Sequence, residues 1–299
     1  MEIASFQFDL VAKDELRLPP YKGSAFRGLL GHALLKTVCV VNKLQCVDCL
    51  LRQNCAYAYL FETFNDRNEK VAHPFLIEPP LTENTLYPAG DLLKVNVILM
   101  GRAIDYLPYI IHTFREMGKR GIGYSRGKFW VKEVYLRSNG VKQCIYNQEE
   151  QTINTRFERL NLFGLPKVPT EQITIQFITP TAIKVNNQVS RSINFEILIK
   201  TIIRRLKALS YYHNGRTEDL FKIDFERVQQ IRTVSENLRP YYWERLSNRQ
   251  KQKIGFEGFV GEIQFEGDLT PFSHLLAMGE HVHIGRGTVY GMGMYRMTI

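Results

Sequence analysis

The chain has 299 residues, enough for two domains of ordinary size, and its 44% hydrophobic and 23% charged residues are typical of a folded globular protein. This composition excludes a disordered chain, a fibrous chain and a small disulfide-stapled domain. Lys and Arg outnumber Asp and Glu by 39 to 30, a formal charge of +9, and the chain also carries 18 Phe, 15 Tyr and 2 Trp. Such a surface suits a polyanion, although many basic proteins carry positive charge only for solubility.

The first residues predict a strand and not a targeting segment. They alternate apolar and polar side chains and reach charged residues within a few positions, unlike a secretory signal. The most apolar runs, such as Val95–Met100 and Leu107–Ile111, are far shorter than the roughly 18 residues that a membrane-spanning helix needs. We therefore expect a cytoplasmic protein that makes no membrane contact.

In chain order, the first half predicts a strand at 3–11, a helix at 23–39, an aromatic stretch at 57–64, a strand at 93–100, a helix at 104–117 and a strand at 129–136. The second half predicts a strand at 173–178, a helix at 194–212, strands at 241–249 and 258–265, a helix at 271–278 and a last strand near 289–298, with residues 220–238 as an insertion. We interpret this order as an α+β fold of two tandem ferredoxin-like βαββαβ domains. The predicted domains cover residues 1–140 and 171–299, with a connection at 141–170.

The second helix of each predicted domain ends in Met-Gly, at Met117-Gly118 and at Met278-Gly279. In both halves a loop containing glycine and arginine follows and leads into the last strand. Two glycine caps alone would be a trivial coincidence. The matching loop chemistry favours an ancient duplication.

Four of the five cysteines lie close together, at Cys39, Cys46, Cys49 and Cys55. In a cytoplasmic chain, thiolates at such spacing favour zinc over disulfides, and the Cys46-x-x-Cys49 pair is the strongest part of the pattern. We predict a small metal-knuckle insertion at 39–55, in which these four residues hold a structural zinc and leave no open position for a catalytic metal. An iron–sulfur cluster and four unconnected buried thiols are the alternatives, and Cys144 is a lone thiol.

A glycine-rich stretch near the end of the chain contains Arg286 and follows His283. Glycine lets a backbone approach a phosphate chain closely, and arginine pairs with phosphate. No P-loop or dinucleotide fingerprint is present. The alternative is an ordinary turn between a helix and a strand. The candidate glycines are Gly285, Gly287, Gly291 and Gly293.

The loop GRGTVYGMGMY after LLAMGEHVH resembles the C-terminal signature of the CRISPR-associated repeat-processing endoribonucleases, the Cas-six group of the RAMP superfamily. The segment YKGSAFRGLLGH at 21–32, the cysteine knuckle and CAYAYLFE at 55–62 resemble the N-terminal half of one branch of that family. The resemblance implies two RRM-related domains that bind CRISPR repeat RNA, as pre-crRNA and crRNA, and cut it without a catalytic metal.

Cleavage of RNA by its own 2′-hydroxyl needs proton transfer, for which histidine is suited near neutral pH. On the helix predicted at 23–39, His32 falls opposite the apolar stripe, and Lys36 follows one turn later on the same side. We predict that His32 is the general acid or base, that Lys36 stabilises phosphate charge and that Tyr21 orients the hydroxyl. Alternatively, His32 is an ordinary exposed helix residue or packs against the knuckle, and His283 is the second candidate.

The same helix contains two interior glycines, Gly28 and Gly31. Each costs about 1 kcal/mol of helix stability relative to alanine. Close approach of another backbone, from RNA or from the protein itself, would explain why they are tolerated.

Strand periodicity places Trp243, Arg245, Ser247 and Arg249 on one face, where arginine suits phosphate, serine a 2′-hydroxyl and tryptophan a base. A solvated edge strand is the alternative. In the first half, basic residues surround Gly121–Gly123. The complete predicted RNA-binding set is Arg27, Arg120, Arg126, Lys128, Trp243, Arg245, Ser247, Arg249, His283, Gly285, Arg286, Gly287, Gly291 and Gly293.

Two functions compete at this point. The first is a metal-independent endoribonuclease that matures CRISPR RNA, as a monomer or homodimer that can also join a CRISPR effector complex. The second is a noncatalytic RNA-binding RAMP subunit of such a complex. A zinc-dependent DNA-binding regulator is disfavoured because no recognition helix adjoins the knuckle.

Overall fold

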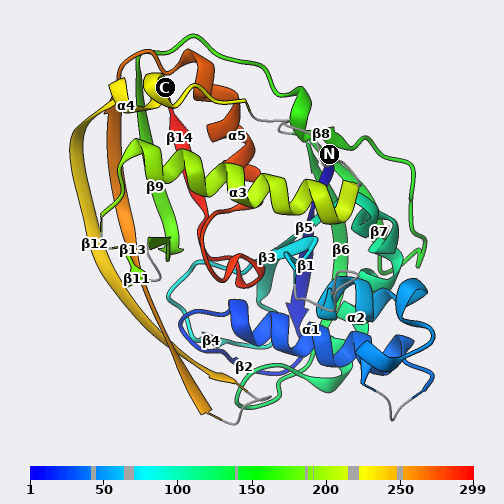
Figure 1. The fold of residues 1–299 in the computed structure, drawn as a ribbon. Helices are drawn as coiled ribbons and strands as arrows, with labels where there is room; N and C mark the ends of the chain where they lie inside the picture. The colour runs from blue at the N-terminus through cyan, green and yellow to red at the C-terminus, as the bar shows by residue number, and fades with distance from the viewer. Residues whose placement is uncertain are drawn as a thin grey trace. The chain divides into compact units, whose positions relative to one another are not determined.

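The computed structural model describes residues 1–41, 45–63, 71–138, 141–185, 188–190, 192–214, 222–247 and 252–299, without the side chains of 245–247 and 252–254. The chain divides into two compact units (Figure 1). Unit 1 is Met1–Leu160 together with Tyr212–Asn214, and unit 2 is Asn161–Tyr211 together with Gly215–Ile299. No helix in these described ranges has both the length and the apolar character needed to cross a bilayer.

The sheet of unit 1 has the strand order β3-β5-β1-β6-β7, and every neighbouring pair is antiparallel. Its first four members are the second, third, first and fourth core strands in chain order, which is the ferredoxin-like arrangement. Apolar and polar residues alternate along β1, which is why the sequence predicts this strand. Its Phe8 stacks on Phe114 of α2 with ring centroids 4.3 Å apart. The elements are β1 (Glu2–Ala12), α1 (Gly23–Val38), β3 (Phe75–Glu78), β5 (Leu92–Met100), α2 (Leu107–Arg120), β6 (Phe129–Ser138) and β7 (Val141–Asn147), with the two-residue strands β2 (Leu16–Arg17) and β4 (Leu86–Tyr87) paired to each other.

The sheet of unit 2 has the order β12-β13-β9-β14, again the second, third, first and fourth core strands. Phe195 of α3 packs against Phe265 of β13 and Phe272, with ring centroids 5.2 and 5.3 Å apart. The prediction of tandem ferredoxin-like domains is therefore confirmed. The elements are β9 (Gln172–Thr181), α3 (Phe195–Asn214), α4 (Phe225–Gln230), β12 (Arg232–Ser247), β13 (Gln252–Glu266), α5 (Ser273–Val282) and β14 (Tyr295–Thr298), with the small hairpin β10 (Lys184–Val185) and β11 (Gln188–Val189), and β8 (Leu160–Asn161) at the unit boundary.

Three predicted elements need correction. Residues 232–238, predicted as part of an insertion, belong to the core strand β12, because their backbone pairs with β13. The aromatic stretch contains a π-helical turn, Ala58–Glu62, and the second core strand of unit 1 is instead β3. All four β3 residues are buried, so the strand shows no alternation that a sequence pattern could reveal. Residues 141–147, which we placed in the connection, form β7 on the edge of the first sheet because their backbone pairs with β6.

The Met-Gly pairs lie inside helices α2 and α5 and do not cap them. A Cβ added at Gly118 would lie 2.1 Å from the carbonyl oxygen of Phe129, the first residue of β6. A Cβ added at Gly279 would lie 2.3 Å from the hydroxyl of Tyr295, the first residue of β14. Each glycine therefore lets the second helix approach the start of the strand that follows, which strengthens the case for duplication.

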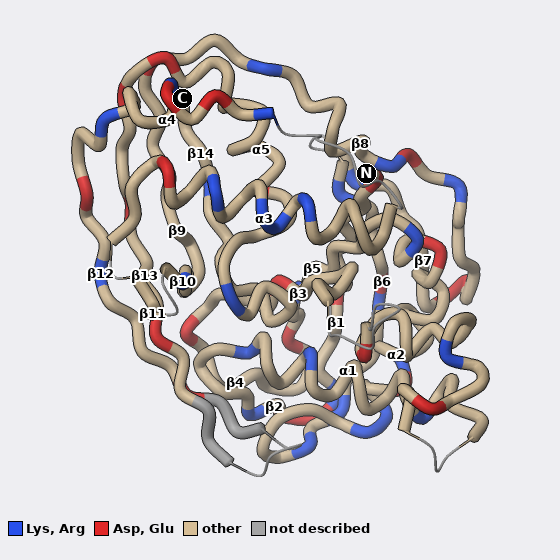
Figure 2. Tube along the Cα trace, in the orientation of Figure 1, with Lys and Arg blue, Asp and Glu red and all other residues tan. Residues whose placement is uncertain are grey.

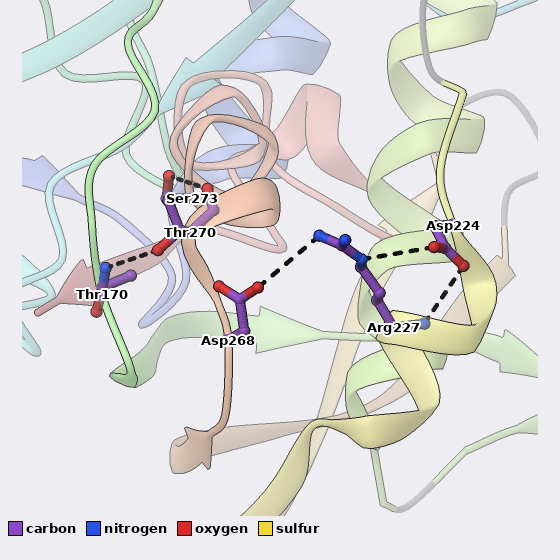
Figure 3. A network of polar contacts seen from close by, with 6 residues as sticks. All are labelled: Thr170, Asp224, Arg227, Asp268, Thr270 and Ser273. Atoms are coloured by element: carbon purple, nitrogen blue, oxygen red, sulfur yellow. Dashed lines mark hydrogen bonds and ion pairs between the residues drawn. The ribbon is translucent and has the colours of Figure 1, made fainter.

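A polar network fixes the helical insertion of unit 2 (Figure 3). Asp224 caps α4 by accepting a hydrogen bond from the backbone N–H of Glu226 at 3.0 Å. Arg227 then lies 3.5 Å from Asp224 and 3.9 Å from Asp268. These exposed ion pairs orient α4 more than they stabilise it.

Candidate RNA-binding and cleavage site

Helix α1 has a buried side and an exposed side. Phe26, Leu30 and Leu34 are at most 1% exposed and hold the helix against the core of unit 1. At the start of the helix, the buried Lys22 donates from Nζ to the carbonyl oxygens of Pro20 at 3.1 Å and Thr82 at 2.7 Å. The opposite side carries Gly28, His32 and Lys36, which are all exposed and four residues apart.

His32 has two cationic neighbours. Partial burial of its ring, followed by the positive charges of Lys36 and Arg120, lowers the pKa of His32 below its ordinary value of 6.5. Arg120 belongs to the last turn of α2, and its Nη1 is buried without a hydrogen-bond partner among the described residues. Unit 1 thus places a histidine that is neutral at pH 7 beside two positive charges, which is a suitable arrangement for an anionic phosphate.

The two glycines of α1 have different surroundings. A Cβ at Gly31 would lie 2.7 Å from the ring of Phe61, so the close approach there comes from the protein itself. A Cβ at Gly28 would meet nothing within 4 Å. Packing within the protein therefore explains Gly31 and leaves Gly28 unexplained.

Two residues predicted for RNA contacts at or near α1 are less exposed than His32 and Lys36. Tyr21 is only 7% exposed, so its side chain belongs to the core and cannot orient a hydroxyl of bound RNA without rearrangement. Arg27 is half-buried, and its guanidinium lies 5.0 Å from the ring centroid of Phe61.

The loop after α2 extends the basic surface of unit 1. Arg126 and Lys128 are exposed, and Arg126 has a positive φ of 50°. A Cβ at Gly121 would lie 1.9 Å from the carbonyl oxygen of Arg126, so glycine permits this tight turn. The turn therefore holds two exposed cations just beyond Arg120.

In the glycine-rich loop of unit 2, several backbone N–H groups already donate hydrogen bonds within the protein. The N–H groups of Ile284 and Arg286 donate to Gly293 at 3.0 Å and Ala182 at 2.9 Å, and that of Gly293 donates to Pro180 at 3.1 Å. A Cβ at Gly293 would lie 1.8 Å from the oxygen of Ile284. The expected approach of phosphate to bare backbone therefore needs correction, because these N–H groups already bond to the loop itself and to residues 180 and 182, at and just beyond the end of β9.

Among the predicted residues of this loop, Arg286 is the exposed one, Gly285 and Gly287 are half-buried, and Gly291 and Gly293 are buried. His283 is fully buried, and its Nδ1 donates to the carbonyl oxygen of Met292 at 3.1 Å. It holds the loop together and is not placed to contact RNA. Lys and Arg occur in both units and are interspersed with Asp and Glu (Figure 2), so net charge alone does not select a binding surface.

The strand predicted to carry Trp243 forms part of a long hairpin, β12–β13. Trp243 faces Phe256 across the hairpin, with ring centroids 5.3 Å apart. Arg245 and Ser247 lie on β12, although only their backbone is described, and Arg249 lies outside the described residues. Sequence periodicity found Trp243 but missed Phe256, because the register of the hairpin was unknown.

The four knuckle cysteines are free and half-buried, and 3-10 turns at Cys46–Asp48 and Arg52–Asn54 shape the segment. Burial, then the charge of Glu62 and the other three thiols, raises the pKa of Cys46 to about 11. Within the described ranges, no three His, Cys, Asp or Glu side chains converge in a way that would hold a metal ion. The predicted zinc is therefore unsupported, because close spacing along the chain did not bring the sulfurs into one coordination sphere.

Comparisons with known proteins match both units. Residues 1–158 match the AF_1859_N N-terminal domain family, and residues 175–295 match the family described as CRISPR-associated endoribonuclease Cas6. A protein of Archaeoglobus fulgidus is 27% identical over 296 residues, covering 95% of this chain and 93% of its own.

Solved structures share the fold over the full length. Thermus thermophilus Cas6 (TTHB231) is 16% identical, covers 99% of this chain and 98% of its own, and gives a TM-score of 0.55. Its product complex gives a TM-score of 0.58 at 16% identity, with all of both chains covered. A partial Cas6-RT-Cas1–Cas2 complex gives 0.56 at 14% identity, covering 99% of this chain and 46% of that one. The match across residues 1–158, more than half of the chain, places the protein in the AF_1859_N N-terminal domain family, while residues 175–295 match the Cas6 family of CRISPR-associated endoribonucleases and the solved Cas6 structures share the tandem ferredoxin-like fold.

Proposed function

We propose that the protein binds CRISPR repeat RNA and cleaves it, without a catalytic metal, through attack by the RNA's own 2′-hydroxyl, which yields mature crRNA. The match of residues 175–295 to the family of CRISPR-associated endoribonucleases Cas6 supports repeat-RNA processing as the general activity. The observation that carries the mechanism is the exposed His32 with Lys36 and Arg120 as its charged neighbours.

In the proposed reaction, neutral His32 takes the proton of the 2′-hydroxyl, and the 2′-oxygen attacks the adjacent phosphorus. The bond to the 5′-oxygen of the next nucleotide breaks, and that oxygen takes a proton from solvent or from His32 after its protonation. The products are a 2′,3′-cyclic phosphate and a free 5′-hydroxyl. Lys36 and Arg120 stabilise the negative charge that develops on the phosphoryl oxygens, which is a role that a metal ion takes in other nucleases.

The lowered pKa of His32 supports its assignment as the base. A histidine with an ordinary pKa near 6.5 is already mostly neutral at pH 7, and the neighbouring cations disfavour its protonated form further. The same cations attract the scissile phosphate. Within unit 1, Arg126 and Lys128 are further candidates for phosphate contacts. Within unit 2, the candidates for RNA contacts are Arg286 and the β12–β13 hairpin.

The test is cleavage of end-labelled repeat RNA by the purified protein in excess EDTA. We expect one shortened product from the wild-type protein, and loss of cleavage with retained RNA binding from His32→Ala. His112→Ala, which removes an exposed histidine from α2, is the matched control and should cleave normally. RNA binding by the wild-type protein without cleavage would instead favour the noncatalytic subunit, and full activity of His32→Ala would remove His32 from the mechanism.

One structural relative occurs within a Cas6-RT-Cas1–Cas2 complex. We propose that the cleaved RNA stays bound and that this protein delivers it to a CRISPR effector complex. Copurification of the mature RNA with the protein after cleavage is the expected outcome.

A further inference from the structure

The hairpin of unit 2 extends beyond the sheet that anchors it. Strand β13 pairs with β9 from Glu266 to Phe259, whereas its described residues nearer the tip, 252–258, pair with β12 alone. An isolated two-stranded ribbon is marginally stable in water, and aromatic pairs across the strands are a common means of supporting it.

Three aromatic side chains connect this extension to the glycine-rich loop. Trp243 and Phe256 are opposite each other in register, with ring planes at 36°. Phe256 meets Tyr290 edge to face, with centroids 6.4 Å apart and planes at 71°. All three residues are half-buried, so none of them is enclosed in the core of unit 2.

The loop holds Tyr290 rigidly. Tyr290 ends a 3-10 turn, Thr288–Tyr290, between Gly287 and Gly291, whose φ angles are 77° and 85°. The N–H groups of Tyr290 and Gly291 donate back to Gly287 and Thr288 at 2.9 and 2.8 Å. Because much of the loop backbone is already hydrogen-bonded internally, what the loop offers a ligand is the ring of Tyr290 and the exposed side chain of Arg286.

We infer that Trp243, Phe256 and Tyr290 form a stacking platform for unpaired bases, so that unit 2 takes a single-stranded segment of the RNA. This inference rests on the proposed function and narrows its substrate class. Aromatic rings stack on bases whose faces are free, whereas the bases of a duplex cover one another. Arg286 supplies a cation for the phosphates of the same segment. A base-paired stem would meet this surface only through its backbone.

The chain has 2 tryptophans, which makes the platform directly observable. Trp130→Phe leaves Trp243 as the single tryptophan reporter. Trp243→Phe leaves Trp130, which is 45% exposed on β6 in unit 1 and serves as the matched control. Each variant is titrated with an unstructured repeat RNA that carries a 2′-deoxy nucleotide at the scissile position, with the same RNA annealed to its complement, and with inorganic polyphosphate.

We expect the single strand to quench the emission of Trp243 strongly, and the duplex and polyphosphate to leave it nearly unchanged. Tyr290→Leu should weaken binding of the single strand about fivefold or more, and Tyr290→Phe, which keeps the ring, should restore it. Tight binding without quenching of Trp243, or equal quenching by the duplex, would overturn the platform. Cleavage is scored separately, so a protein that cleaves without quenching refutes the platform alone, and one that quenches without cleaving refutes the proposed nuclease alone.

Discussion

Gly28 offers a sharp test of whether RNA lies along the exposed side of α1. It occupies the interior of a 16-residue helix, in line with His32 and Lys36, and an added Cβ would meet nothing within 4 Å. Alanine is about 1 kcal/mol more favourable than glycine in a helix interior. We therefore expect Gly28→Ala to raise the free energy of unfolding of unit 1 by about 1 kcal/mol.

Gly31→Ala is the matched control within the same helix. Its Cβ would lie 2.7 Å from the Phe61 ring, so the gain in helix propensity is opposed by displacement of a buried aromatic residue. For a unit of this size, 1 kcal/mol corresponds to a Tm shift of about 2–4 °C. Calorimetry of the two variants should show an increase for Gly28→Ala and a decrease for Gly31→Ala.

The functional measurement uses the same position. If RNA passes over Gly28 to reach His32, a side chain there displaces the scissile phosphate, and misplacement of about 1 Å can cost about 100-fold in rate. We expect single-turnover cleavage by Gly28→Gln to fall by about tenfold or more while its stability rises. Loss of stability in Gly28→Ala would refute the packing argument. If Gly28→Ala and Gly28→Gln both raise the free energy of unfolding and leave the cleavage rate unchanged, RNA does not pass along this side of α1.

Two further predictions concern the cations and the loop. Partial burial, Lys36 and Arg120 lower the pKa of His32, and protonation inactivates a base. The wild-type cleavage rate should therefore rise with pH, with the midpoint of this acid limb below about 6.5. Lys36→Met or Arg120→Met should shift the limb to higher pH, and an unmoved limb would separate these residues from His32. In unit 2, Gly293→Ala should lower the free energy of unfolding by more than about 1 kcal/mol, because Gly293 has a φ of 73° and lacks room for a Cβ. The control is Gly255→Ala, whose added Cβ would meet nothing within 4 Å. Equal urea midpoints for the two variants would contradict the argument.

Much of the fold follows from patterns that are local in the sequence. The alternation of β1 and the 3.6-residue period of α1 are properties of short segments, so they predict which side chains are buried before any partner is known. The same period places His32 and Lys36 on one exposed side. Strand β3 escaped prediction because a short strand buried on both faces has no alternation.

Tertiary packing decided the rest of the candidate site. Arg120 is far from His32 in the chain and comes close only because α1 and α2 pack together in unit 1. Burial of Tyr21 and His283 depends on what covers them, and the pairing of Trp243 with Phe256 depends on hairpin register. The cysteine spacing alone likewise did not decide whether the thiols form a metal site, because that depends on the conformation of the loop. Periodicity acts over one or two turns, whereas proximity between distant segments is settled only when their apolar faces are buried together.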